Sequence, residues 1–66
     1  MIITLNGAKC EVDDGTTVAT LISTHTGSHR GTAIIVEGEV VPRGVWDMTA
    51  LREGQTVEMV TAVQGG

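Results

Sequence analysis

The chain has 66 residues, 41% of them hydrophobic, with four basic and eight acidic residues and a formal net charge of −4. This length fits one domain with a thin core, and the acidic balance argues against nucleic-acid binding, which needs clustered cations. The single cysteine, Cys10, excludes an internal disulfide and a CxxC redox pair, and no apolar run reaches the length of a membrane span. With neither an export signal nor a disulfide, we expect a cytoplasmic protein.

The chain begins with a predicted β-hairpin. Residues 2–5 and 8–12 are β-prone runs joined by Asn6-Gly7. Asn-Gly is the strongest short hairpin signal, because both positions tolerate positive φ. Asp13-Asp14-Gly15 then closes the second strand as a turn.

A single helix is expected next. Thr16 or Thr17 can cap it, and Gly27 is a natural stop. Its apolar stripe, at spacings i, i+3 and i+4, consists of Val18, Leu21 and Ile22. Residues 23–31 are rich in Thr, Ser and Gly and are expected to form a loop.

The second half of the chain predicts three more strands. Residues 32–37 are β-branched and nearly all apolar, which predicts a strand buried on both faces. A short strand follows at Val40-Val41, and Pro42 ends it or confines it to a sheet edge. Residues 45–51 are irregular with room for one helical turn, and residues 56–63 form the longest strand.

The order of these elements predicts the fold class. A hairpin, a crossover helix and a return strand give an α+β arrangement in which the helix packs on one face of a mixed four- to five-stranded sheet. The crossover allows the first and last strands to lie side by side and parallel. This is the ubiquitin-like β-grasp, as one domain over residues 1–66.

Several chemically capable side chains are expected to have structural roles. His25 and His29 are four residues apart, but Gly27 lies between them and no third ligand is near, so a solvated loop is expected and no metal site. Asp13-Asp14 is typical of a turn, and we expect no functional carboxylate pair there. Cys10 shares a strand face with apolar neighbours, which indicates a small core residue.

Trp46 is the only aromatic residue of the chain. A lone tryptophan usually fills a core with its N–H paired, and contact with a partner is the alternative. Arg43, just before it, either binds a carboxylate or phosphate of a partner through its rigid donor fork or is solvated in a turn.

The C-terminal diglycine is the feature that a purely structural role explains least. Gly65 and Gly66 follow the longest strand with only Gln64 between. Three extended residues reach roughly 10 Å, and without Cβ atoms the glycines can thread a narrow channel. The terminal carboxylate of Gly66 must be activated before it can accept a nucleophile, as ATP does with AMP as the leaving group. Val60 and Ala62 lie on the strand face predicted to point away from the helix, and with Gln64 and Gly65 they are expected to contact partners.

The segments that carry a family pattern are Asn6-Gly7, residues 15–18, Leu21-Ile22, residues 40–46, Leu51, Gly54, Val57-Glu58 and residues 62–66. Together they resemble the ThiS-type sulfur carriers of thiamine biosynthesis. The most specific motif is Val-Pro-Arg-x-x-Trp, which ends at Trp46. Gln64 departs from the Gly or Ala that more usually precedes the diglycine.

This resemblance implies a carrier rather than an enzyme. A ThiF-type adenylyltransferase would activate the Gly66 carboxylate with ATP and magnesium. A persulfide sulfur, supplied through a cysteine desulfurase, would displace AMP and leave a thiocarboxylate on Gly66. A ThiG-type thiazole synthase would then take the sulfur into the thiazole ring. The resemblance implies that the carrier itself binds no cofactor and no metal.

Other functions remain open from the sequence, and one of them is sulfur transfer for a different sulfur-containing metabolite. The small subunit of molybdopterin synthase also ends in Gly-Gly, but it is usually longer and richer in Phe, and this chain has no Phe. A ubiquitin-like modifier would be joined through Gly66 to a lysine of its target. A plain binding module would carry the diglycine incidentally.

Overall fold

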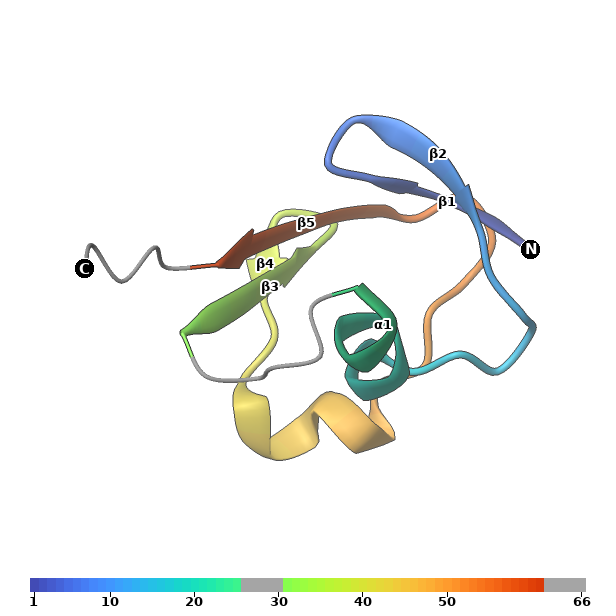
Figure 1. The fold of residues 1–66 in the computed structure, drawn as a ribbon. Coiled ribbons are helices and arrows are strands. Elements are labelled where there is room, and N and C mark those ends of the chain that lie inside the picture. Colours follow the sequence, from blue (N-terminus) through green and yellow to red (C-terminus); the bar gives the residue numbers. More distant parts are fainter. Residues whose placement is uncertain (26–30, 62–66) are drawn as a thin grey trace.

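The computed structural model describes residues 1–25 and 31–61, which form a mixed five-stranded sheet with an α-helix and a 3-10 helix on one side of it (Figure 1). The elements are β1 (Ile2–Leu5), β2 (Ala8–Glu11), α1 (Val18–His25), β3 (Thr32–Val36), β4 (Glu39–Val40), the 3-10 helix η1 (Arg43–Met48) and β5 (Thr56–Thr61). The strand order is β2-β1-β5-β3-β4. β1 and β5 pair in parallel, and the other pairs are antiparallel. The predicted α+β class and the parallel pairing of the first and last strands are both confirmed.

Both hairpins of the sheet turn through two residues with positive φ. Asn6 and Gly7 have φ of 50° and 83°, and Glu37 and Gly38 have φ of 51° and 82°. This left-handed backbone matches the twist of two paired strands. Glycine and asparagine adopt this conformation readily, whereas it strains the backbone at Glu37.

Helix α1 begins where the sequence predicts and extends further than predicted. The Thr17 hydroxyl accepts a hydrogen bond from the Thr20 N–H at 3.2 Å, as an N-cap residue does. The prediction of a loop from residue 23 is wrong, because the helix continues through His25. In this threonine-rich turn the Thr24 hydroxyl donates to the Thr20 carbonyl at 2.9 Å, a bond that threonine can make within a helix. Gly27 and His29 lie outside the described residues. Neither α1 nor any other helix of the described part is long and apolar enough to cross a membrane.

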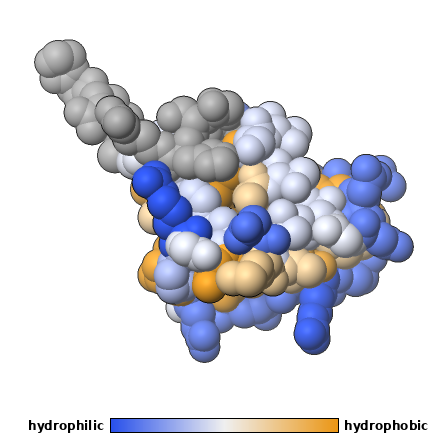
Figure 2. All heavy atoms as spheres, turned by 90° about the horizontal axis from the view of Figure 1, so that it is seen from below, coloured by the Kyte–Doolittle hydropathy of each residue, from blue (hydrophilic) through white to orange (hydrophobic). Residues whose placement is uncertain are grey.

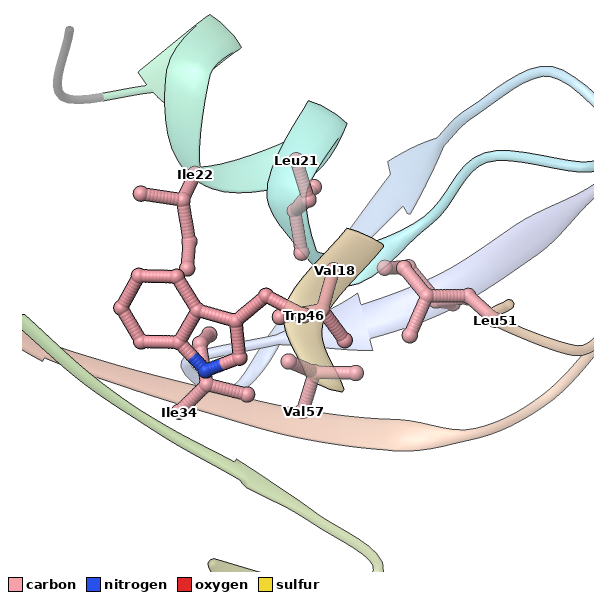
Figure 3. Packing of buried hydrophobic residues seen from close by; sticks show 8 residues of the cluster. Val18, Leu21, Ile22, Ile34, Trp46, Leu51 and Val57 are labelled. Atoms are coloured by element: carbon pink, nitrogen blue, oxygen red, sulfur yellow. The ribbon is translucent and has the colours of Figure 1, made fainter. Parts of the chain in front are cut away.

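The core lies between the sheet and the two helices. Its buried members are Ile3, Val18, Leu21, Ile22, Ile34, Trp46, Leu51 and Val57. Figure 3 shows the indole of Trp46 reaching from η1 toward Ile22 of α1 and Ile34 of β3. Trp46 is only 4% exposed, and its indole N–H donates to the Val41 carbonyl at 2.9 Å. The prediction of a core tryptophan with a paired N–H is therefore confirmed.

Three predictions about the second half need correction. The strand at residues 32–36 is not buried on both faces: Ile34 is buried and Ala33 is exposed, because both helices cover the same side of the sheet. The short strand is Glu39–Val40, one residue earlier than predicted, and Pro42 follows it at the sheet edge. The helical turn that the sequence allowed within residues 45–51 is a six-residue 3-10 helix, Arg43–Met48, which starts two residues earlier.

Candidate functional site

The site predicted from the sequence is built on β5. This strand lies at the centre of the sheet, between β1 and β3. It pairs with β3 over all but its first residue, from Val36 opposite Val57 to Thr32 opposite Thr61, and with β1 only near its start. The predicted site residues Ala62, Gln64, Gly65 and Gly66 lie outside the described residues. The last described residue of β5 lies on the side of the molecule opposite the N-terminus (Figure 1).

A group of apolar side chains crosses the sheet face that carries no helix. Ala33 of β3 is opposite Val60 of β5, and Ile35 of β3 is opposite Val40 of β4. Because paired residues share a sheet face, these four form one surface, which we call the outer patch. Val60 is 54% exposed and Val40 is 68% exposed. The prediction that Val60 is left uncovered is confirmed.

Two turn residues bind the backbone of β5 from opposite sides. Asn6 accepts a hydrogen bond from the Met59 N–H at 2.8 Å and donates one to the Met59 carbonyl at 3.2 Å. The Glu37 carboxylate accepts from the Thr56 N–H, and the Glu37 N–H donates to the Thr56 carbonyl at 2.9 Å. The Asn6 side chain thus continues the β1–β5 ladder after β1 has turned away. Both contacts fix the strand that leads to the C-terminus.

Sequence reasoning assigned Asn6 to a turn and Glu37 to the end of a strand, but it did not anticipate that these two residues bind β5. The one available signal was chemical: an amide side chain carries a donor and an acceptor like those of a peptide group. Nothing in the sequence indicated which strand that amide would reach.

Arg43 lies on the other side of the sheet from the outer patch. It is the first residue of η1, and its guanidinium carbon lies 5.5 Å from the centroid of the Trp46 ring, within cation–π range. The structure therefore does not bring Arg43 together with Val60 on one surface. The predicted contact between Arg43 and a partner stays a prediction. It would involve the side of the sheet that carries the helices.

Most of the polar side chains that we expected to have structural roles lie where such roles require. The carbonyl of Asp13 accepts from the Thr16 hydroxyl at 2.7 Å in the predicted turn, and the Asp14 carboxylate lies 3.5 Å from the N-terminal ammonium. Cys10 is half-buried against the core. His25 differs from the prediction, because it is helical and its Nε2 lies 4.0 Å from the Cys10 Sγ. Within residues 1–25 and 31–61, no three His, Cys, Asp or Glu side chains could hold a metal ion together.

The mixed five-stranded sheet with the helix on one face is a ubiquitin-like β-grasp, and its central strand β5 is the last strand of the described residues. The model of the ThiS family matches residues 3–66, so the chain belongs to the ThiS family. The resemblance found in the sequence motifs is thereby confirmed.

Solved structures agree with this assignment. The crystal structure of a thiamine biosynthesis protein (ThiS) from Geobacter metallireducens is 29% identical to this chain, with a TM-score of 0.83 and full coverage of both chains. The solution structure of a thiamine biosynthesis protein from the same organism is 29% identical, with a TM-score of 0.82, and the match covers all of this chain and 88% of that one. No curated protein sequence matches this chain significantly.

Proposed function

We propose that this protein is the sulfur carrier that delivers sulfur as a C-terminal thiocarboxylate for thiazole formation in thiamine biosynthesis. The observation that carries the proposal is the ThiS-family match, which includes Gly65 and Gly66. Two structures of thiamine biosynthesis proteins with the same fold support it. The central position of β5 supports it as well, because a strand held on both sides gives the diglycine a fixed starting point.

The chemistry follows from the C-terminal carboxylate. A ThiF-type adenylyltransferase, using ATP and magnesium, joins the Gly66 carboxylate to AMP and releases pyrophosphate. The mixed anhydride is an electrophile, so the terminal sulfur of a persulfide from a cysteine desulfurase displaces AMP and forms an acyl disulfide on Gly66. A thiol then reduces this disulfide, releasing the thiocarboxylate, and is itself oxidised to a disulfide. The resulting thiocarboxylate on Gly66 is the sulfur donor for a ThiG-type thiazole synthase. The carrier supplies the reacting carboxylate and a surface by which both enzymes hold it, and it performs no catalysis itself.

The outer patch is the surface we assign to these partners. It lies on β5, β3 and β4, with exposed Val60 and Val40 on the strand face away from the helices. Together with Ala62, Gln64 and Gly65 it would form one continuous contact that ends at Gly66. The chain has a net charge of −4, so a partner with basic residues around an apolar centre would associate faster than a neutral one. Each interface should be modest in area, because the carrier must leave one enzyme before it binds the next.

The opposite face offers a weaker alternative for docking. On the side of η1, hydrophobic and hydrophilic side chains are interspersed (Figure 2). Met48 and Val45 of η1 are 72% and 37% exposed. We favour the outer patch because it includes β5 itself, whereas η1 is separated from β5 by the core.

The decisive experiment is intact-protein mass spectrometry after incubation with the activating enzyme, ATP and a persulfide donor. The full chain should gain the mass that corresponds to exchanging one oxygen for sulfur. A variant lacking Gly66 and a variant with one residue added after Gly66 should both fold and gain nothing, with folding checked by circular dichroism. Loading of either variant would contradict the proposal. Higher-mass conjugates that survive hydroxylamine would instead identify a ubiquitin-like modifier joined to lysine.

A further inference from the structure

Strand β2 leaves one side of its backbone open. It is an edge strand, and within the described residues it pairs only with β1 (Figure 1). Val12, the residue after β2, donates to the Met1 carbonyl at 2.9 Å and accepts from the N-terminal ammonium at 2.8 Å. In an antiparallel pair such doubly bonded positions alternate with unbonded ones. The backbone N–H and C=O groups of Lys9 and Glu11 therefore point away from β1.

Nothing in the described part of the chain occupies these outward groups. Lys9 and Glu11 are exposed, and within residues 1–25 and 31–61 neither their outward backbone groups nor their side chains take part in a hydrogen bond or ion pair. Such an open row of backbone groups is a template for a further strand. The other edge of the sheet is less open, since β4 has only two residues and Pro42 follows soon after it.

We propose that β2 binds the β2 strand of a second copy of this chain. The two strands run antiparallel about a two-fold axis at Cys10, so that the two sheets become one. Lys9 then lies opposite Glu11 of the second copy, and Glu11 lies opposite Lys9 of the second copy. Each of these pairs exchanges both backbone hydrogen bonds, which satisfies all the outward groups of both residues. Because residues i and i+2 share a sheet face, each pair also brings opposite charges together on the outer face.

The charges favour this register over its neighbours. Sliding one strand by two residues in one direction places Lys9 opposite Lys9 of the second copy, and sliding it in the other direction places Glu11 opposite Glu11. Like charges directly opposite each other destabilise a strand pair. Sliding by one residue would set the outward backbone groups against groups already bonded to β1. An edge lysine usually discourages pairing, but of these registers the one centred on Cys10 places no like charges opposite each other.

The pairing leaves the carrier surface open. β2 and β4 are the opposite edges of the sheet, so the outer patch on β5, β3 and β4 stays accessible in the dimer. The contact uses one four-residue strand from each chain, which is much smaller than the interface of a stable dimer. The dimer should therefore form only at high concentration. The inference does not depend on sulfur transfer, and its failure would leave the proposed function untouched.

Sedimentation equilibrium of the full chain, with its thiol kept reduced, measures the association. We expect a monomer–dimer equilibrium with a dissociation constant of about 0.1–1 mM. Lys9→Glu or Glu11→Lys alone places like charges opposite each other in both pairs and should raise that constant about tenfold or more. An equimolar mixture of the two variants restores opposite charges in both pairs, so it should associate about tenfold more tightly than either variant alone. Glu39→Lys makes the matched charge change on β4 and should not weaken the dimer.

Circular dichroism checks that each variant is folded, and the mixture tests the pairing with the same two chains that fail to pair alone. A wild-type chain that stays monomeric at about 1 mM would overturn the proposal. So would a dimer that neither charge reversal weakens, or a mixture that associates no better than its components.

Cys10 gives an independent measure of the register. On the two-fold axis it lies opposite Cys10 of the second copy in a pair without backbone bonds, where Cα atoms are about 4.5 Å apart, within the range of about 4.4–6.8 Å that a disulfide spans. Oxidised glutathione takes two electrons and the two thiol protons from such a pair, which leaves one disulfide between the chains and two molecules of reduced glutathione. By intact-protein mass, the mixture of Lys9→Glu and Glu11→Lys chains should form a cross-linked heterodimer about tenfold faster than either variant forms its homodimer. Equal rates would overturn the proposed register.

Discussion

Replacing Trp46 with alanine tests whether the most specific motif of the chain serves the core or a partner. The indole is 4% exposed and lies in the cluster that joins α1, η1 and the sheet. Truncating a buried aromatic residue to alanine costs about 3–5 kcal/mol of unfolding free energy. The variant also loses the hydrogen bond to the Val41 carbonyl, for which about 1 kcal/mol is typical. A domain of 66 residues has a total stability of about 5 kcal/mol, so Trp46→Ala should be largely unfolded at room temperature.

Urea unfolding followed by far-ultraviolet circular dichroism measures this change, because the variant lacks the chain's only fluorescent side chain. Trp46→Phe is the matched control. It keeps an aromatic ring in the core but loses the N–H, so it should cost about 1–2 kcal/mol. A loss below about 0.5 kcal/mol in Trp46→Ala would refute the core role and would make Trp46 a candidate for partner contact.

The remaining predictions concern β5 and the thiol. Asn6→Ala should lower the unfolding free energy by about 1–3 kcal/mol, because Met59 loses both side-chain hydrogen bonds and alanine tolerates the left-handed turn poorly; Asn6→Gly, which keeps the turn and loses only the amide, should lose less, and an unchanged stability of Asn6→Gly would mean that the amide contributes nothing. Val60→Lys should raise the KM of the activating enzyme for the carrier about tenfold, whereas Met48→Lys on η1 should leave it within about twofold; the reverse order would place docking on the helix side. Cys10→Ser should leave sulfur loading at the C-terminus unchanged, and complete loss of loading would show that the thiol takes part.

The sequence alone determined the elements and their order, because those depend on local signals. Alternation of apolar residues predicted the strands, Asn6-Gly7 predicted the first hairpin, and the i, i+3, i+4 stripe with Thr17 before it predicted the start of the helix. The motif at residues 40–46 together with the diglycine predicted the ThiS family, which the family match confirms. These signals come from residues close together in the chain, where covalent geometry already restricts the conformation.

Only the tertiary structure decided which faces are covered and which distant groups meet. Residues 32–36 are apolar enough for burial on both faces, but α1 and η1 lie on the same side of the sheet, so Ala33 remains exposed and the outer patch exists. Asn6 meets Met59 across 53 positions of sequence, and Cys10 meets His25 across 15. No local preference determines such contacts, because they arise when separate elements pack against one core and their side chains take the positions that this packing leaves.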